Sequence, residues 1–336
     1  MSTMILRPKS PLRRHVTQSG AAPAAPTVTV PSWLRKAVEA AQTVEDATLA
    51  TGAAIAMLDA VVRRDEKWAG AWRQRLALAA AAATARQTGR VEDEAALRDS
   101  FLLTRPGDDV GPGGLLLLGW RRLAARPAEE LLTKKSLAAV LEEFGFFARD
   151  GAAVSDLADA LRRLATTEGA VGMLTGAYAA VEGHGLPRAM GPWLADALLA
   201  QRLGWSHAVP VLTSEPKGGK SSSRARLPAG TPSAAASDPA KFLLAAQAHA
   251  ALLAIDLSAE LERRADRLLA VAPKLRAKGA DTVVDRLLND DALVASRGDK
   301  STGMSDRGLR RLFDRLVELG AVRELSGRAT FRIYGL

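Results

Sequence analysis

The apolar positions of the chain recur with helical spacing over most of its length. From Trp33 onward they fall every three or four residues, and no long stretch alternates between apolar and polar residues as a half-buried strand would. Residues 32–213 are therefore predicted to form an all-helical body of roughly six to eight helices, one of them over 128–148. Trp68 and Trp72 lie four residues apart, so they share a helix face and are expected to pack in the core.

A segment rich in serine, proline and glycine, residues 214–238, follows the body and has the composition of a flexible basic linker or insertion. Gly219, Lys220 and Ser221 reproduce the end of the phosphate-binding pattern GxxxxGK[ST]. The first glycine of that pattern is replaced by Ser214, and no helical pattern follows, so we interpret the match as accidental.

After this segment, the apolar residues return to one face of a long predicted helix, Pro239–Leu269. It belongs to a helical extension, residues 239–279, that is expected to pack on the body. Residues 280–336 then have the pattern of a separate small unit. Its first helix is predicted over Ala280–Leu288, and a short second helix is predicted over Asp290–Ser296.

The end of the chain has the pattern of a helix followed by a hairpin. Ser305 is a favourable N-cap, and apolar residues recur at helical spacing until Gly320. Ala321–Leu325 and Thr330–Tyr334 are then rich in strand-forming residues and flank a turn. A helix followed by a hairpin is typical of a winged helix-turn-helix. The predicted fold class is thus mainly α, a multi-helix, bundle-like body with a C-terminal winged helix-turn-helix.

Arginine dominates the polar face of this last helix and recurs in the hairpin. A helix that presents guanidinium groups can lie in the major groove of DNA while the hairpin touches the flanking backbone. A solvated amphipathic helix is the alternative, because basic faces are often only surface. The residues predicted to contact DNA are Arg307, Arg310, Arg311 and Arg315 on the helix and Arg323, Arg328 and Arg332 in the hairpin.

The charge balance also favours a polyanionic partner. The chain has 46 lysines and arginines against 37 aspartates and glutamates, a formal net charge of +9. Residues 1–31 contain several prolines and four lysines and arginines without an acidic residue, which predicts a disordered basic arm able to add phosphate contacts. DNA is therefore the expected partner. Winged-helix proteins often dimerise, which allows a homodimer.

The sequence offers no clear catalytic or metal-binding group. It contains no cysteine and only four scattered histidines, which excludes disulfides and cysteine-rich zinc sites. Glu92, Asp93, Glu94 and Asp99 gather at a predicted helix start, where they complement the helix dipole; a metal or acid/base site is the alternative. His184 lies in a glycine-rich loop without a partner nucleophile or carboxylate nearby. We therefore predict no cofactor, and the sequence specifies no small-molecule ligand.

The hydropathy of the chain gives an expectation about its location. No run of 18 or more apolar residues occurs, and the basic start lacks a long apolar segment. These features argue against a membrane span and against secretion. We therefore expect no membrane partner, and we expect the protein to be cytoplasmic.

Four stretches carry a family resemblance: WRQRLALAAAAATARQTGRVEDEAALRDS, GWRRLA, KLRAKGADTVVDRLLNDDALVAS and MSDRGLRRLFDRLVELGAVRELSGRATFRIYGL. They resemble an uncharacterised domain-of-unknown-function family that is common in GC-rich alphaproteobacteria and often plasmid-borne. The resemblance covers nearly the whole chain. It implies an all-helical body and brings no activity, cofactor or site residue with it.

The last part alone also resembles the module that closes many Fic-domain proteins, in which LVELGxxRExxGR precedes a final aromatic strand. Fic enzymes use a His-Pro-Phe-x-x-Gly-Asn-Gly-Arg loop before a helix. This chain offers EGHGLPRAMG, in which His184 and Gly185 are present and the phosphate cradle is missing. We therefore predict a DNA-binding transcriptional or plasmid-associated regulator without enzymatic activity. The alternatives are a non-catalytic protein-interaction adaptor and a degenerate Fic-like nucleotidyl transferase.

Overall fold

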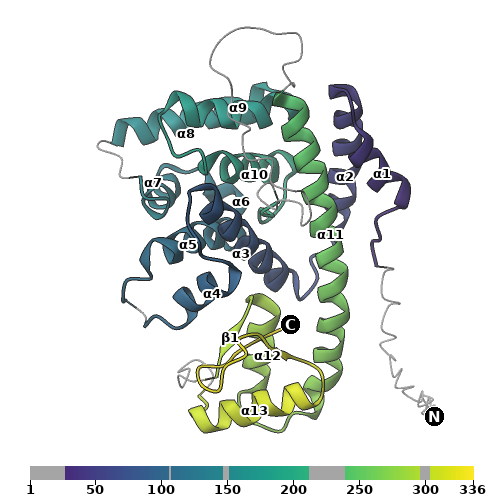
Figure 1. Cartoon of the computed structure of the whole chain (residues 1–336), viewed down its shortest axis with the longest axis vertical. Coiled ribbons are helices and arrows are strands. Elements are labelled where there is room, and N and C mark those ends of the chain that lie inside the picture. The colour runs from purple at the N-terminus through teal and green to yellow at the C-terminus, as the bar shows by residue number, and fades with distance from the viewer. Residues whose placement is uncertain (1–26, 106, 147–150, 212–238, 296–302) are drawn as a thin grey trace, which may run out of the picture.

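A computed structural model gives the fold of the chain and describes residues 27–105, 107–146, 151–211, 239–295 and 303–336. These residues are mainly helical, and a small three-stranded sheet lies near the C-terminus (Figure 1). The helices of the first two thirds of the chain are α1 (Ser32–Ala40), α2 (Val44–Arg63), α3 (Ala69–Gln87), α4 (Glu94–Leu102), α5 (Gly111–Ala125), α6 (Ala128–Leu131), α7 (Lys134–Glu143), α8 (Gly151–Thr167), α9 (Ala170–Gly183) and α10 (Met190–Leu203). The remaining elements are α11 (Pro239–Val271), the 3-10 helix η1 (Ala272–Lys274), α12 (Ala280–Asn289), β1 (Leu293–Val294), α13 (Asp306–Glu318), β2 (Arg323–Glu324) and β3 (Ile333–Gly335).

Helices α1 to α10 and the long helix α11 pack together and are called the body from here on; α11 is its central helix. Figure 1 shows α11 running from the end of the molecule that holds α9 to the end that holds α12. Its main neighbour is α2, and the Thr51 hydroxyl of α2 donates a hydrogen bond to the Leu244 carbonyl oxygen at 2.8 Å. From α3, the indole of Trp72 donates to the Ala254 carbonyl oxygen at 2.9 Å. The prediction that Trp68 and Trp72 pack in the core is confirmed, since they are 5% and 2% exposed.

The stretch formed by nearly all of α11 together with η1 has the length and composition of a membrane span. Among the residues that the structure describes, this is true of one stretch, Ala240–Lys274, whose most apolar 18-residue window has a mean hydropathy of 1.5. Half of that window is buried inside the protein, and a core helix meets the same criteria of length and composition. The expectation that the chain does not span a membrane stays a prediction.

The body is divided into more helices than the sequence pattern predicted. Ten helices, α1 to α10, occur in the described residues before 212, because polar caps interrupt runs that looked continuous. The single helix predicted over 128–148 is wrong: α6 ends at Leu131, and Thr133 caps α7, its hydroxyl accepting a hydrogen bond from the Ser136 amide at 3.3 Å. Thr43 and Asp46 likewise form a capping box that separates α1 from α2.

The terminal unit, residues 280–336, contains α12, α13 and the sheet. All strands are antiparallel in the order β1-β3-β2, so β3 is central. Tyr334 of β3 pairs with Leu293 of β1 on one side and with Glu324 of β2 on the other. Its ring stacks on Phe313 of α13, with centroids 4.4 Å apart. The sheet and α13 therefore pack against each other, and their buried residues continue the apolar core of the body.

Three predictions for this unit were wrong in detail. In place of a short helix over Asp290–Ser296, the described part of this segment is extended and forms β1, because pairing with β3 buries Leu293. The predicted strand Thr330–Tyr334 begins only at Ile333. Phe331 has a φ of 54°, in the left-handed region, which a regular strand does not contain. The other predicted strand, 321–325, shrinks to β2.

A buried ion-pair cluster joins the terminal unit to the body. The Asp291 carboxylate, 5% exposed, accepts hydrogen bonds from the guanidinium groups of Arg75 of α3 and Arg98 of α4, the latter at 2.6 Å. Burial alone would raise the pKa of Asp291, but the two arginines outweigh burial and lower it below 3.8. Beside the cluster, Arg121 of α5 pairs with Asp290 at 2.7 Å. These contacts fix the terminal unit at one end of the molecule (Figure 1).

Candidate nucleic-acid interface

Helix α13 forms where the sequence predicted it, because both of its ends are defined locally. Ser305 is the N-cap, and its hydroxyl accepts a hydrogen bond from the Gly308 amide at 3.2 Å. Gly320 follows the helix with a φ of 64°, which glycine adopts at little cost. One face of α13 is buried in the terminal unit by Leu309, Leu312, Phe313 and Leu316. The opposite face is exposed at the end of the molecule remote from α8 and α9 (Figure 1).

The four arginines predicted on α13 all lie on this exposed face. Arg307, Arg310 and Arg311 form no ion pair with any residue that the structure describes. Arg315 pairs with Glu318 at 3.1 Å, but both side chains are at least 60% exposed, so water screens the pair strongly. The face therefore offers guanidinium groups that are available to an external anion.

Two of the hairpin arginines lie close to residues of the body. Arg328 forms an ion pair with Asp99 of α4, so it bridges the hairpin to the body. Arg323 lies on β2 near Arg264 of α11, whose pKa is lowered first by burial and then by the charge of Arg323. The prediction that these two arginines contact DNA stays a prediction, and the structure places both next to the body.

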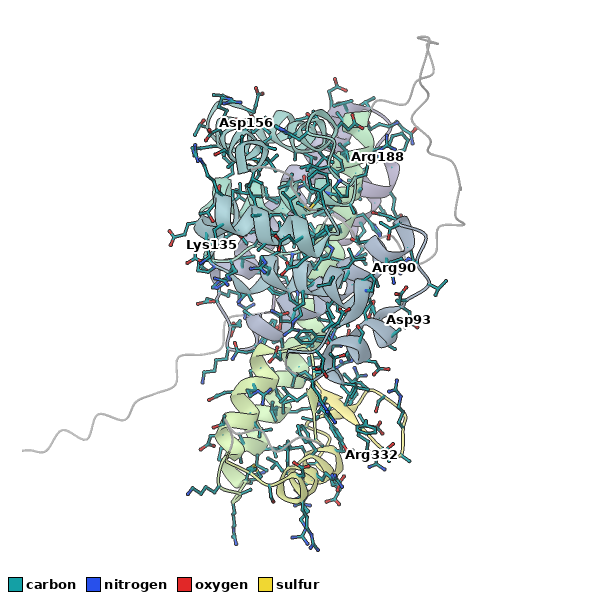
Figure 2. All side chains as sticks on the ribbon, turned by 90° about the vertical axis from the view of Figure 1, so that its left-hand side faces the viewer. Arg90, Asp93, Lys135, Asp156, Arg188 and Arg332 are labelled. Atoms are coloured by element: carbon teal, nitrogen blue, oxygen red, sulfur yellow. The ribbon has the colours of Figure 1, made fainter. Side chains whose placement is uncertain are left out.

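The third hairpin arginine, Arg332, lies beside α13. Its guanidinium group is 3.9 Å from the Asp314 carboxylate and donates a hydrogen bond to the Arg328 carbonyl oxygen at 3.3 Å. The pKa of Arg332 is raised, chiefly by a hydrogen bond with the side chain of Tyr334. Figure 2 shows Arg332 on the terminal unit, at the far end of the molecule from Asp156 of α8. It extends the arginine face of α13 toward the hairpin.

The exposed face of α13 is not uniformly basic. Asp306, Asp314 and Glu318 are exposed on the same helix as the four arginines. Most of the positive excess lies in other parts of the sequence: residues 1–26 contain four lysines and arginines and no acidic residue, and residues 212–238 contain four against two. The face therefore presents individual cationic groups between carboxylates rather than a broad positive field.

A groove of about 290 Å³ opens between α13 and the loop that precedes β3. Phe331 in its wall is 55% exposed, while Tyr334 is buried with only 2% of its surface exposed. The groove thus combines an exposed aromatic ring with charged groups from two elements. Its lining residues are Ala295, Arg310, Asp314, Ala329, Thr330, Phe331, Arg332 and Tyr334.

Sequence reasoning missed this groove. The segment Thr330–Tyr334 reads as a strand, which would place Phe331 and Ile333 on one face of the hairpin. The left-handed backbone at Phe331 instead turns its ring out of the strand pattern. The one available signal was a large aromatic residue directly before an arginine in a loop next to a glycine-containing turn.

The carboxylates gathered at the start of α4 have structural roles, as the simpler interpretation predicted. The Asp93 carboxylate caps α4 and accepts a backbone hydrogen bond at 2.8 Å. Glu92 pairs with Arg90, which lowers the pKa of Glu92. Asp99 pairs with the hairpin through Arg328. Figure 2 shows Arg90 and Asp93 on the outer surface of the body.

The remaining chemical candidates are not brought together. His184 is the C-cap of α9, and beside it Arg188 and Glu182 form an exposed ion pair at 3.7 Å. Within the described ranges, no group of three or more histidine, aspartate or glutamate side chains is placed to hold a metal ion. The phosphate-loop pattern in 214–238 and residues 1–26 of the basic arm lie outside the described residues.

Comparison with known proteins places the chain in a family. No curated protein matches the chain. The family described as "Protein of unknown function (DUF1403)" matches residues 21–336, a range that includes both the body and the terminal unit. The chain belongs to the DUF1403 family.

Proposed function

We propose that the protein binds duplex DNA through α13 and the hairpin that follows it, as a cytoplasmic transcriptional or plasmid-associated regulator. The observation that carries the proposal is the exposure of Arg307, Arg310 and Arg311 and the lack of ion-pair partners for them among the described residues. They are exposed at one end of the molecule and form no ion pair with a described residue. Such guanidinium groups can bind phosphate oxygens, and they can also bind the O6 and N7 atoms of guanine in a major groove.

The arrangement of the terminal unit supports the proposal that it is a winged helix that contacts the DNA. Helix α13 rests on a sheet through its apolar face and is followed directly by β2 and β3. A helix in this position can enter the major groove while the hairpin lies beside the flanking backbone. Arg332 is the hairpin arginine next to α13, so we assign it to this contact. Arg328 and Arg323 are assigned lesser roles because of their positions near α4 and α11.

The proposal makes binding strongly dependent on salt. Each phosphate neutralised by an arginine releases counterions and contributes about −0.9 to the slope of log affinity against log salt concentration. The test is a salt titration of binding to labelled duplex fragments, measured by fluorescence anisotropy on the full chain. Absence of binding at low salt would overturn the proposal.

A matched pair of triple variants identifies the surface. Replacing Arg307, Arg310 and Arg311 by alanine should weaken binding and make the salt slope less steep by about 0.9 for each phosphate that is no longer neutralised. The control is the triple variant Arg162→Ala, Arg163→Ala and Arg188→Ala, which removes the same charge from exposed positions of α8 and the loop before α10. An equal reduction of affinity in both variants would mean that net charge, rather than α13, drives binding.

A protein-interaction adaptor is the second candidate, and the acidic residues on α13 favour it. Asp306, Asp314 and Glu318 alternate with the arginines and would repel neighbouring phosphates, whereas a protein partner could pair with both signs of charge. If the protein is an adaptor, the wild-type chain should not bind duplex DNA at low salt. It should bind a protein partner, and the α13 triple variant should not bind that partner. Neither candidate includes a catalytic step.

A further inference from the structure

The groove between α13 and the loop before β3 has features of a base-binding site. We infer that it accepts one unpaired nucleobase of the bound DNA, stacked on the ring of Phe331. The inference rests on the proposed function, because the groove shares Arg310 with the duplex-binding face of α13. It goes beyond that function because it adds a preference for DNA in which a base is out of the stack.

The backbone at Phe331 is the first support. A φ of 54° is strained for a residue with a bulky side chain, and such strain persists only when the surroundings hold it. Phe331 is 55% exposed, so burial of its ring does not explain the conformation. Strained residues cluster at sites that hold a ligand, and an exposed aromatic ring offers a large flat surface to one.

The surroundings of the ring are the second support. Arg310 of α13 and Arg332 of the hairpin both line the groove, so an anion and a flat apolar group could be held at the same time. Tyr334, which is buried and stacked on Phe313, forms the inner wall. Asp314 also lines the groove, and the Arg332 guanidinium 3.9 Å away partly offsets its charge.

These features fit a nucleotide better than an apolar segment. A nucleotide supplies a planar ring for Phe331 and a phosphate for Arg310 or Arg332, whereas an apolar peptide would leave Arg310 without an anionic partner. A base that is paired and stacked inside a duplex cannot enter the groove beside α13, because its flat faces are covered by the neighbouring bases. An unpaired base, such as one in a single-nucleotide bulge, can leave the stack at little cost.

The test compares three DNA probes of equal length with the full chain: a blunt duplex, the same duplex with a one-nucleotide bulge, and a duplex with an abasic bulge. Stacking of one base on an aromatic side chain predicts roughly 5- to 150-fold tighter binding of the bulged duplex than of the blunt one. The abasic bulge, which bends like the bulged duplex but has no base, should bind like the blunt duplex. Equal affinity for the two bulged probes would overturn the inference and leave the proposed function intact.

Variants of the ring assign the preference to Phe331. Phe331→Ala should remove the preference for the bulged base while keeping the blunt-duplex affinity and its salt slope, and Phe331→Tyr should retain the preference. The control is Phe242→Ala on α11, because Phe242 is the same residue type with a similar exposure of 57%. If Phe331→Ala weakened all three probes equally, Phe331 would be a duplex contact and the inference would fail. If the wild-type chain bound none of the probes, the proposed function itself would fail.

Discussion

The arginines at the two sides of the terminal unit have opposite surroundings. On the side that faces the body, the side chains of Arg75 and Arg98 are 15% and 11% exposed and share the carboxylate of Asp291. On the far side, the arginines of α13 are exposed, and three of them form no ion pair with a described residue. Arginine thus has two roles in this unit. On one side it fixes the position of the unit, and on the other it presents charge to solvent.

This difference separates stability from binding. Removing one member of a buried ion pair leaves an uncompensated charge in a region of low polarity, so the folded state loses free energy. Removing an exposed arginine without a partner changes the folded state little. Substitutions on the body side should therefore act on unfolding, and substitutions on α13 should act on the proposed association with DNA.

The largest effect is expected for Asp291→Ala. The substitution leaves Arg75 and Arg98 buried without their shared carboxylate and should lower the free energy of unfolding by about 3–5 kcal/mol. Chemical denaturation monitored by circular dichroism measures this change in the free energy of unfolding. Asp285→Ala, at an exposed position of α12, is the control and should change stability by less than about 0.5 kcal/mol. Similar values for the two variants would show that the buried cluster does not hold the unit in place.

The same carboxylate predicts how this stability depends on pH. The pKa of Asp291 is lowered from 3.8 on folding, so its charge stabilises the folded state fully above about pH 5. That contribution is lost as the pH falls below 3.8 and through the folded-state pKa. The stability difference between wild type and Asp291→Asn should therefore be constant at neutral pH and shrink in acid. Denaturation curves of both proteins from about pH 7 to about pH 3 measure it, and a difference that grew in acid would contradict the prediction.

An intermediate effect is expected for Arg121→Ala. Arg121 pairs with Asp290 at 2.7 Å, and its guanidinium carbon lies 4.5 Å from the centre of the Phe101 ring. The two charged side chains are 19% and 31% exposed, so the pair is only partly shielded from water. We expect the free energy of unfolding to fall by about 1–2 kcal/mol. A decrease as large as that of Asp291→Ala would mean that burial does not rank these contacts.

The sequence predicted those features of the terminal unit that depend on near neighbours. The cap at Ser305 and the glycine at Gly320 define α13 locally, and both were predicted. Strand β1 was missed because its conformation depends on pairing with β3, about forty residues away, and on arginines of α3 and α4 that hold Asp291. No local pattern encodes such partners.

The same limit applies to the candidate interface. Sequence spacing placed the four arginines of α13 on one face, and the structure agrees. It could not show that Arg328 pairs with Asp99, which is 229 residues away in the chain. Nor could it indicate the left-handed backbone of Phe331, because that conformation is uncommon for phenylalanine and has no sequence signal.

The smallest effect on stability is expected for the triple variant Arg307→Ala, Arg310→Ala and Arg311→Ala. Alanine has a higher helix propensity than arginine, and the replaced side chains form no described ion pair, so the free energy of unfolding should change by less than about 1 kcal/mol. Duplex binding by the same variant should nevertheless weaken strongly. Denaturation and anisotropy measured on one preparation separate the two effects. A destabilisation above about 2 kcal/mol would mean that these arginines have internal partners, and weaker DNA binding would then report damage to the fold instead of the removal of a binding surface.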